Sequence, residues 1–204
     1  MLRLLLVRHG ETRWNLERRI QGAGSDVELS GMGKIQAQRL SQVFKDEDLA
    51  GIYSSPLQRA RTTAEAIARP HDMEAKLEAR LKEIDAGDLE GVLVESLGYN
   101  LSQFLVPEPG GRMTDLPGGE GLDDLQERAW SVVEGILETH QTGQVIVLSH
   151  YFTILTIICR ALGFPLSAVR RMRAAPGSIS TIAFLEHGPM LFSLNETCHL
   201  TSTV

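Results

Sequence analysis

The sequence is poor in cysteine and in aromatic residues. Only two of its 204 residues are cysteines, Cys159 and Cys198, and Phe, Trp and Tyr together make up 5%. Two cysteines far apart do not form the disulfide framework of a small secreted domain, and they lack the paired spacing of a zinc site. We interpret both as free thiols of an intracellular protein, with a disulfide or a metal pair as the alternative.

Basic stretches and long apolar runs are also missing. The net charge is -6, and no basic segment is interleaved with aromatics, which argues against a nucleic-acid partner. The longest apolar segment, residues 151–162, includes Arg160 and spans about a dozen residues, fewer than the ~20 that cross a membrane. The apolar N-terminus is too short for a signal peptide. We therefore expect a cytoplasmic protein with no membrane partner.

The composition that remains is that of one soluble domain. Hydrophobic residues make up 43% of the chain and charged residues 23%, and 204 residues suit a single core. Between residues 91 and 121 the sequence is irregular and rich in proline and glycine. Connections of this length are usually lids or binding loops, so we predict a single domain over residues 1–204 with a lid-like insertion at about 91–121.

Short apolar segments end abruptly in polar residues, which is typical of strands in a parallel sheet covered on both faces. Residues 4–7 lead into Arg8 and His9, and residues 145–148 lead into a serine and His150. Ligands of such sheets lie beyond the carboxyl ends of the strands. We therefore expect these arginine and histidine side chains to meet at one edge of the sheet.

Amphipathic periodicity predicts helices between the strands and a closing hairpin. The expected helices cover residues 31–44, a segment that starts at Pro56, residues 122–138, and a segment that starts at Tyr151, and the expected hairpin joins residues 178–184 to 190–194. Ser55 and Gln58 have the spacing of a capping box. Arg59 lies off the apolar stripe in the first turn, where a cation is unfavourable unless an anion binds there too. Arg59 is therefore either an anion ligand or a solvated arginine.

The residues gathered at the strand ends suit phosphoryl transfer. A neutral histidine accepts a phosphoryl group, and arginines stabilise the charge on its oxygens. The helix that begins directly after His150 would add backbone amides that point at an anion. The leaving group needs a proton, for which Glu83 is the candidate, with a solvated glutamate as the alternative. A metal site lacks the H-E-x-x-H or C-x-x-C spacing, and a serine hydrolase lacks the G-x-S-x-G elbow.

Several motifs, in this order, resemble those of the histidine phosphatase superfamily, also called the phosphoglycerate mutase-like family. They are Arg8-His9-Gly10-Glu11-Thr12 with Asn15, Gln21-Gly22, Ser55-Pro56-Leu57-Gln58-Arg59-Ala60, Leu81-x-Glu83, Pro117-Gly118-Gly119-Glu120 and Ser149-His150. The resemblance implies an α/β fold, a three-layer α/β/α sandwich around a mostly parallel sheet. It implies a metal-independent phosphomonoester hydrolase that acts on a small phosphorylated metabolite, with no cofactor and no metal.

The resemblance also assigns roles to residues. His9 would be the nucleophile that becomes phosphohistidine, and Glu83 would be the general acid and then the base. The transferred group would be held by Arg8, Arg59 and His150, and the same pocket would be lined by Asn15, Gln21 and Gly22. Relatives are often dimers, so a homodimer is a further expectation.

The sequence departs from the family pattern at three positions, and two other functions stay open. Tyr151 follows His150 where the family often has glycine, Gly121 replaces a serine, and Leu89 stands where tryptophan is frequent. One alternative is a phosphoglycerate mutase, which needs a second cationic cluster for its bisphosphate ligand. The other is an inactive relative that binds phosphorylated ligands without turnover.

Overall fold

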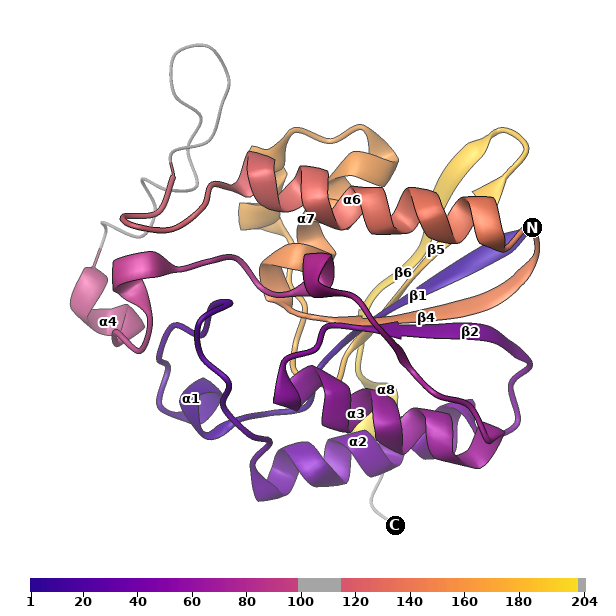
Figure 1. Ribbon diagram of the computed structural model, residues 1–204, viewed down its shortest axis with the longest axis horizontal. Coiled ribbons are helices and arrows are strands. Elements are labelled where there is room, and N and C mark those ends of the chain that lie inside the picture. The colour runs from indigo at the N-terminus through magenta and orange to yellow at the C-terminus, as the bar shows by residue number, and fades with distance from the viewer. Residues whose placement is uncertain (99–114, 202–204) are drawn as a thin grey trace.

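A six-stranded sheet forms the centre of the computed structural model, which describes residues 1–98 and 115–201 (Figure 1). The strands, in the order β3-β2-β4-β1-β5-β6, are β1 (Leu2–Arg8), β2 (Leu49–Ser54), β3 (Lys76–Leu77), β4 (Gly143–Ser149), β5 (Ile179–Leu185) and β6 (Gly188–Glu196). The first four are mutually parallel, while β5 runs antiparallel to β1 and β6 antiparallel to β5. The predicted mostly parallel sheet and its closing hairpin are confirmed.

Helices cover both faces of this sheet (Figure 1). The longer ones are α2 (Gly31–Phe44) and α3 (Gln58–Ala68) on one face, and α6 (Leu122–Thr139) and α7 (Tyr151–Leu162) on the other. Shorter helices are α1 (Arg13–Leu16), α4 (Val94–Leu97) and α8 (Cys198–Thr201), with 3-10 turns at Arg69–His71, Ala79–Leu81, Gly87–Leu89 and Leu166–Arg171. The expected three-layer α/β/α sandwich is therefore confirmed.

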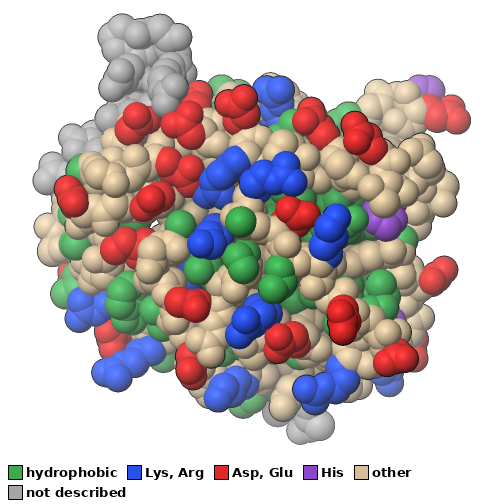
Figure 2. All heavy atoms as spheres, viewed as in Figure 1, with side chains coloured by type: hydrophobic (Ala, Val, Ile, Leu, Met, Phe, Trp, Pro, Cys, Tyr) green, Lys and Arg blue, Asp and Glu red, His purple; other side chains and the backbone are tan. Residues whose placement is uncertain are grey.

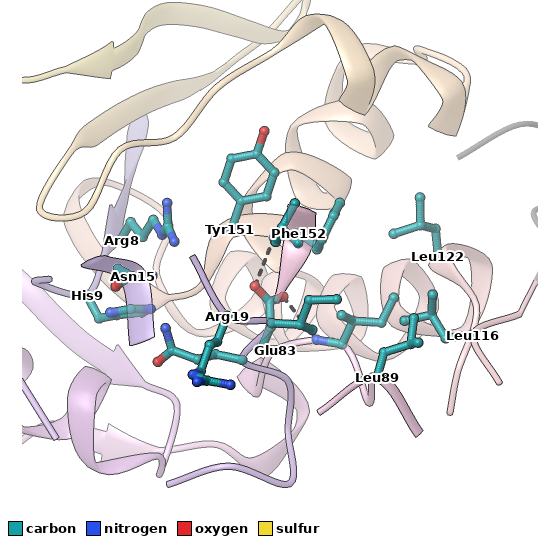
Figure 3. Close-up of a pocket in the computed structure, with 14 residues that line it drawn as sticks. Arg8, His9, Asn15, Arg19, Glu83, Leu89, Leu116, Leu122, Tyr151 and Phe152 are labelled. Atoms are coloured by element: carbon teal, nitrogen blue, oxygen red, sulfur yellow. Dashed lines mark hydrogen bonds between the residues drawn. The ribbon is translucent and has the colours of Figure 1, made fainter. Parts of the chain in front are cut away.

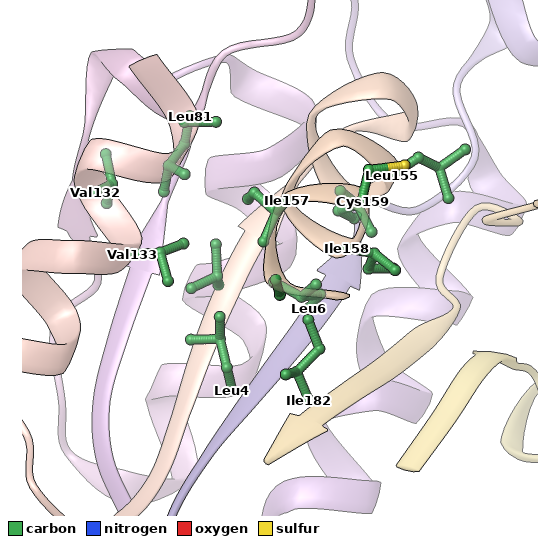
Figure 4. Packing of buried hydrophobic residues seen from close by; sticks show 14 of the residues in the cluster. Leu4, Leu6, Leu81, Val132, Val133, Leu155, Ile157, Ile158, Cys159 and Ile182 are labelled. Carbon is green, nitrogen blue, oxygen red and sulfur yellow. The ribbon is translucent and has the colours of Figure 1, made fainter. Parts of the chain in front are cut away.

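The two central strands, β4 and β1, supply apolar side chains to both helix layers, because successive residues of a strand point to opposite faces. Leu4 and Leu6 of β1 pack with α6 and α7, as Figure 4 shows for their contacts near Val133 and Ile157. Leu5 packs with α2 and α3 in the second cluster. The fully buried stretch of β1, Leu4 to Val7, has no polar residue, and polar residues stand at its two ends, at Arg3 and from Arg8 onward.

The predicted start of α3 was wrong by two residues. The helix begins at Gln58 after the N-cap Leu57, which has no side-chain cap, so Ser55 and Gln58 form no capping box. The Ser55 hydroxyl instead lies 2.8 Å from Nε2 of His150. The interpretation of Arg59 as lying off the buried stripe was also wrong, because its side chain is fully buried.

Three further expectations concern the chain as a whole. Cys159 is buried, Cys198 is exposed, and both are free, as predicted. Among residues 1–98 and 115–201, no helix is long and apolar enough to cross a membrane. The central part of the predicted lid, residues 99–114, lies outside the described residues, so the lid stays a prediction.

Candidate active site

The carboxyl ends of β1 and β4 bring the two predicted histidines together. Arg8 pairs with Ser149 in the parallel register of the two strands, so the residues that follow, His9 and His150, are neighbours. Their ring centroids lie 5.1 Å apart. Both rings are buried, with exposed fractions of 3% for His9 and 0% for His150.

His9 is held as a neutral ring with one free nitrogen. Its Nδ1 lies 2.7 Å from the carbonyl oxygen of Gly10, which only accepts, so Nδ1 carries the proton and Nε2 keeps a lone pair. Burial lowers the pKa of His9 well below its ordinary value, and the neighbouring cations Arg59 and Arg8 lower it further. At neutral pH, Nε2 therefore keeps the lone pair that a nucleophile requires.

In His150 the nitrogen without a partner is a donor, whereas in His9 it is an acceptor. Its Nε2 lies 2.8 Å from the Ser55 hydroxyl, and that oxygen already accepts a hydrogen bond from the Leu57 amide at 3.3 Å. The described residues offer the Ser55 proton no other acceptor, so it points at Nε2 and leaves the His150 proton on Nδ1. Nδ1 is buried and has no partner in the part of the chain that the structure describes. Burial, and then Arg59, lowers the pKa of His150 well below its ordinary value.

Two arginines supply the positive charge of the site. Arg8 donates from Nη1 to the Ala174 carbonyl at 2.6 Å and lies 5.2 Å from the ring centroid of Tyr151. Burial lowers the pKa of Arg8 to about 10, so it stays cationic at neutral pH. Arg59 donates to the carbonyls of Ser25 at 2.6 Å and Gly22 at 3.0 Å. Each arginine has a buried Nε without a partner among the described residues.

Glu83 occupies the start of α7. Its carboxylate accepts hydrogen bonds from the amides of Phe152 at 3.2 Å, Thr153 at 3.3 Å and Ile84 at 3.0 Å. The backbone amides that we expected to point at a bound anion are thus satisfied by this side chain. The structure still places Glu83 on the wall of the same pocket as His9 (Figure 3).

The amide side chains of Asn15 and Gln21 are joined through Thr12. The Thr12 hydroxyl lies 2.8 Å from Oε1 of Gln21 and 3.1 Å from Oδ1 of Asn15. Because Oε1 is engaged, Nε2 of Gln21 is the atom left free, and it is buried without a partner in the described parts of the chain. Both residues line the pocket, as expected.

Gly22 connects its loop to Arg59 and Glu90. Its carbonyl accepts from Arg59, its amide donates to Glu90 at 3.1 Å, and a Cβ there would lie 2.6 Å from the Ile84 carbonyl oxygen. Gly22, Arg59 and His150 are not among the described residues that line the pocket. They lie behind it, so their direct contact with a ligand stays a prediction.

The pocket itself is a cavity of about 250 Å³. Its described lining residues are Arg8, His9, Asn15, Arg19, Ile20, Gln21, Glu83, Ile84, Leu89, Val94, Leu116, Leu122, Tyr151 and Phe152. Acidic and basic side chains are interspersed over the face of the molecule in Figure 2. Any anion is therefore held by the local arginines and not by a broad basic surface on that face.

Arg128 was missed by the sequence analysis. This residue of α6 donates to the carbonyls of Arg80 at 2.7 Å, Lys82 at 2.9 Å and Glu83 at 2.8 Å, and from Nε to Glu120 at 3.1 Å. It fixes the backbone on both sides of the Glu83 side chain. Glu120 belongs to a motif that we noted, but no pattern in the sequence indicated Arg128.

Among the described residues, no group of three or more His, Cys, Asp or Glu could hold a metal ion.

Comparison with known proteins agrees with this arrangement. The family model of the histidine phosphatase superfamily (branch 1) matches residues 4–197. Phosphoserine phosphatase 1 of Hydrogenobacter thermophilus is 36% identical over 203 residues, which cover 98% of this chain and 95% of that protein. The probable phosphoglycerate mutase GpmB of Salmonella choleraesuis is 36% identical over 191 residues, covering 91% and 86%.

A solved structure is similar over the whole fold. The phosphoserine phosphatase of Entamoeba histolytica, crystallised as a histidine-to-alanine mutant with phosphoserine, has a TM-score of 0.85 at 32% identity. The match covers 98% of this chain and 100% of that one. The chain described here therefore belongs to the histidine phosphatase superfamily.

Proposed function

We propose that the protein is a phosphomonoester hydrolase that carries the phosphoryl group on His9 before water removes it. One observation carries the proposal: four buried donor atoms grouped around His9 have no partner among the described residues. They are Nε of Arg8, Nε of Arg59, Nε2 of Gln21 and Nδ1 of His150. Buried donors are normally satisfied, and a phosphoryl group offers several charged acceptor oxygens at once.

The proposed reaction has two steps. In the first, the Nε2 lone pair of His9 attacks phosphorus, the bond from phosphorus to the ester oxygen breaks, and that oxygen takes a proton from the Glu83 carboxyl group. In the second, water attacks the phosphorus of phosphohistidine and gives a proton to the Glu83 carboxylate. The bond from phosphorus to nitrogen breaks, and inorganic phosphate leaves while His9 and Glu83 return to their starting states.

The number of donors matters because the uncatalysed reaction is very slow. A phosphatase has to supply up to about 28 kcal/mol, from a ~10²¹-fold acceleration. One preorganised donor contributes only ~3 to ~4 kcal/mol. Four such donors supply about 12 to 16 kcal/mol, so the covalent route through His9 and the Glu83 proton have to supply the rest.

A phosphoglycerate mutase is the weaker candidate. Beyond Arg8, the one other described cation that lines the pocket is Arg19, which donates to Glu17 at 2.7 Å and to the Gly91 carbonyl at 2.9 Å. The remaining lining offers a second phosphate no free cation within the described residues. The relative with phosphatase in its name and the phosphoserine complex both favour hydrolysis.

The setting of the reaction is also part of the proposal. We expect a cytoplasmic enzyme whose partner is a small phosphorylated molecule and not a nucleic acid. A homodimer stays a prediction, which the molecular mass in solution tests.

Phosphate release from 4-nitrophenyl phosphate, in the presence of a metal chelator, tests the proposal. We expect turnover that survives the chelator and is lost in His9→Ala. Exchange of Leu77, an exposed leucine of β3, for glutamine is the control and leaves turnover at the wild-type rate. Turnover that disappears with the chelator, or that persists in His9→Ala, would overturn the proposed route.

A further inference from the structure

The pocket has two chemically different ends. Arg8 and His9 lie at one end, Glu83 lies between, and Leu89, Leu116 and Leu122 lie at the other (Figure 3). The further apolar lining residues are Ile20, Ile84, Val94 and Phe152. Because the phosphoryl group is bound beside His9, the alcohol part of the ester extends past Glu83 towards the leucines.

Beyond Arg8 at the phosphoryl end, the described charged groups of the pocket already have hydrogen-bond partners. Its described charged lining residues are Arg8, Arg19 and Glu83. Arg19 is bonded to Glu17, and the Glu83 carboxylate accepts hydrogen bonds from the start of α7. Glu83 is the one acidic lining residue among those described, and in the proposed reaction it starts protonated. An ammonium group inside the pocket would therefore find no carboxylate charge there, and an unpaired buried charge is strongly unfavourable.

An aromatic pair forms a firm wall next to the phosphoryl end. The rings of Tyr151 and Phe152 meet edge to face with centroids 5.1 Å apart. The Tyr151 hydroxyl donates to the Met172 carbonyl at 3.2 Å, and Arg8 lies against the other part of the ring. These contacts hold the aromatic surface in place, so the pocket presents it to any ligand without rearrangement.

We infer that the alcohol part of the substrate is an uncharged, apolar alkyl or aryl group, and not an amino acid or a polyol. The inference rests on the proposed function and specifies its substrate class. The cavity of about 250 Å³ is larger than the ~150 Å³ in which an apolar cavity binds benzene, so a phosphoryl group and one ring fit its size. The preference would differ from that of relatives named for phosphoserine.

Three primary alkyl esters test the inference, because their leaving groups have similar intrinsic reactivity: 2-phenylethyl phosphate, phosphoserine and glycerol 3-phosphate. The measurement is kcat/KM for each. We expect 2-phenylethyl phosphate to exceed both others by tenfold or more, since burying two methylene equivalents is already worth about tenfold. A higher kcat/KM for phosphoserine or glycerol 3-phosphate would overturn the inference and leave the proposed hydrolysis intact.

Two variants test whether the leucines form the wall. Leu116→Gln changes a half-buried lining residue and should lower the ratio of kcat/KM for 2-phenylethyl phosphate over glycerol 3-phosphate by about fivefold, mainly through KM. Leu77→Gln makes the same exchange outside the pocket and should leave the ratio unchanged. An unchanged ratio in Leu116→Gln would contradict the inference.

If no ester is hydrolysed, the proposed function is wrong, and the Kd values of the three intact esters then test the apolar preference directly.

Discussion

Ser55 decides which nitrogen of His150 carries the proton. Among the described residues the Ser55 proton has no acceptor other than Nε2 of His150, so Nδ1 carries the ring proton and is a buried donor without a partner there. No charge is involved in this arrangement. A single hydroxyl thus makes Nδ1 of His150 a donor, which in the proposed reaction binds a phosphoryl oxygen.

Removal of that hydroxyl should change both the tautomer and the rate. In Ser55→Ala we expect the Nε2–H form of His150 to appear and kcat/KM to fall on the order of tenfold to a hundredfold, less than the ~10² to ~10³ lost with a donor itself. Nitrogen NMR of labelled histidine measures the tautomer. Ser55→Thr, which keeps the hydroxyl, should retain the Nδ1–H tautomer of His150 and the wild-type kcat/KM. A reduced rate with the Nδ1–H form fully retained would contradict this role.

The two buried histidines also make stability depend on pH. Both pKa values are lowered in the folded protein, whereas histidine in an unfolded chain titrates near ~6.5. Below that pH the unfolded chain binds protons that the folded protein excludes. The contribution of the two neutral histidines to the free energy of unfolding is therefore fully present above pH ~6.5. It is lost as the pH falls towards the folded pKa, by up to ~1.4 kcal/mol per pH unit for each histidine.

Urea unfolding between about pH 6.5 and about pH 5 measures this slope. In His9→Asn the free energy of unfolding should fall less steeply with falling pH than in the wild type, by about 1 kcal/mol per pH unit, because one of the two buried neutral histidines is gone. A slope as steep as that of the wild type would contradict the lowered pKa of His9.

At the scale of secondary-structure elements, α6 holds the Glu83 segment. The Arg128 guanidinium donates to the backbone carbonyls of Arg80, Lys82 and Glu83. Glu120 binds both Arg128 and, at 2.9 Å, the Asp85 amide. Arginine is suited to this task because its planar fork donates in several fixed directions, which a lysine cannot do. The Glu83 segment, which supplies the proton in the proposed reaction, is thus held by a helix that contributes no reacting group of its own to that reaction.

Exchange of Arg128 should lower the rate of the step that needs the Glu83 proton without weakening substrate binding. In Arg128→Lys we expect kcat for an alkyl phosphate to fall by about tenfold, with KM nearly unchanged, because the alkoxide leaving group needs the Glu83 proton. For 4-nitrophenyl phosphate, whose leaving group departs without that proton, the loss should be about twofold or less. Arg61→Lys, the same exchange on the exposed face of α3, is the control. Equal losses for both esters would indicate general damage to the fold and contradict a positioning role.

Local patterns predicted most elements, but they could not predict contacts between distant segments. The strand ends at His9 and His150 and the apolar face of α6 followed from periodicity alone. The burial of Arg59 did not, because its head group is satisfied by carbonyls of a loop more than thirty positions earlier in the chain. The capping of α7 by Glu83 likewise depends on a pairing across 69 positions.

At the scale of the whole molecule, the sheet order creates the site. The adjacency of β1 and β4 places Arg8 beside Ser149, although more than a hundred residues separate the two strands in the sequence. The sequence predicted parallel strands, and hence a shared edge, but not which strands are neighbours. Because the chain carries a net charge of -6, a phosphorylated ligand is held by contacts inside the pocket and not by the overall field.

The most direct test of the account is to trap the phosphoryl group on the protein. The enzyme is mixed with an alkyl phosphate, quenched in alkaline denaturant and examined by mass spectrometry. We predict one phosphoryl group on His9 in the wild type, a longer-lived one in Glu83→Gln, where the second step lacks its base, and none in His9→Ala. Hydrolysis by the wild type with no phosphoryl group on His9 at any time would contradict the account.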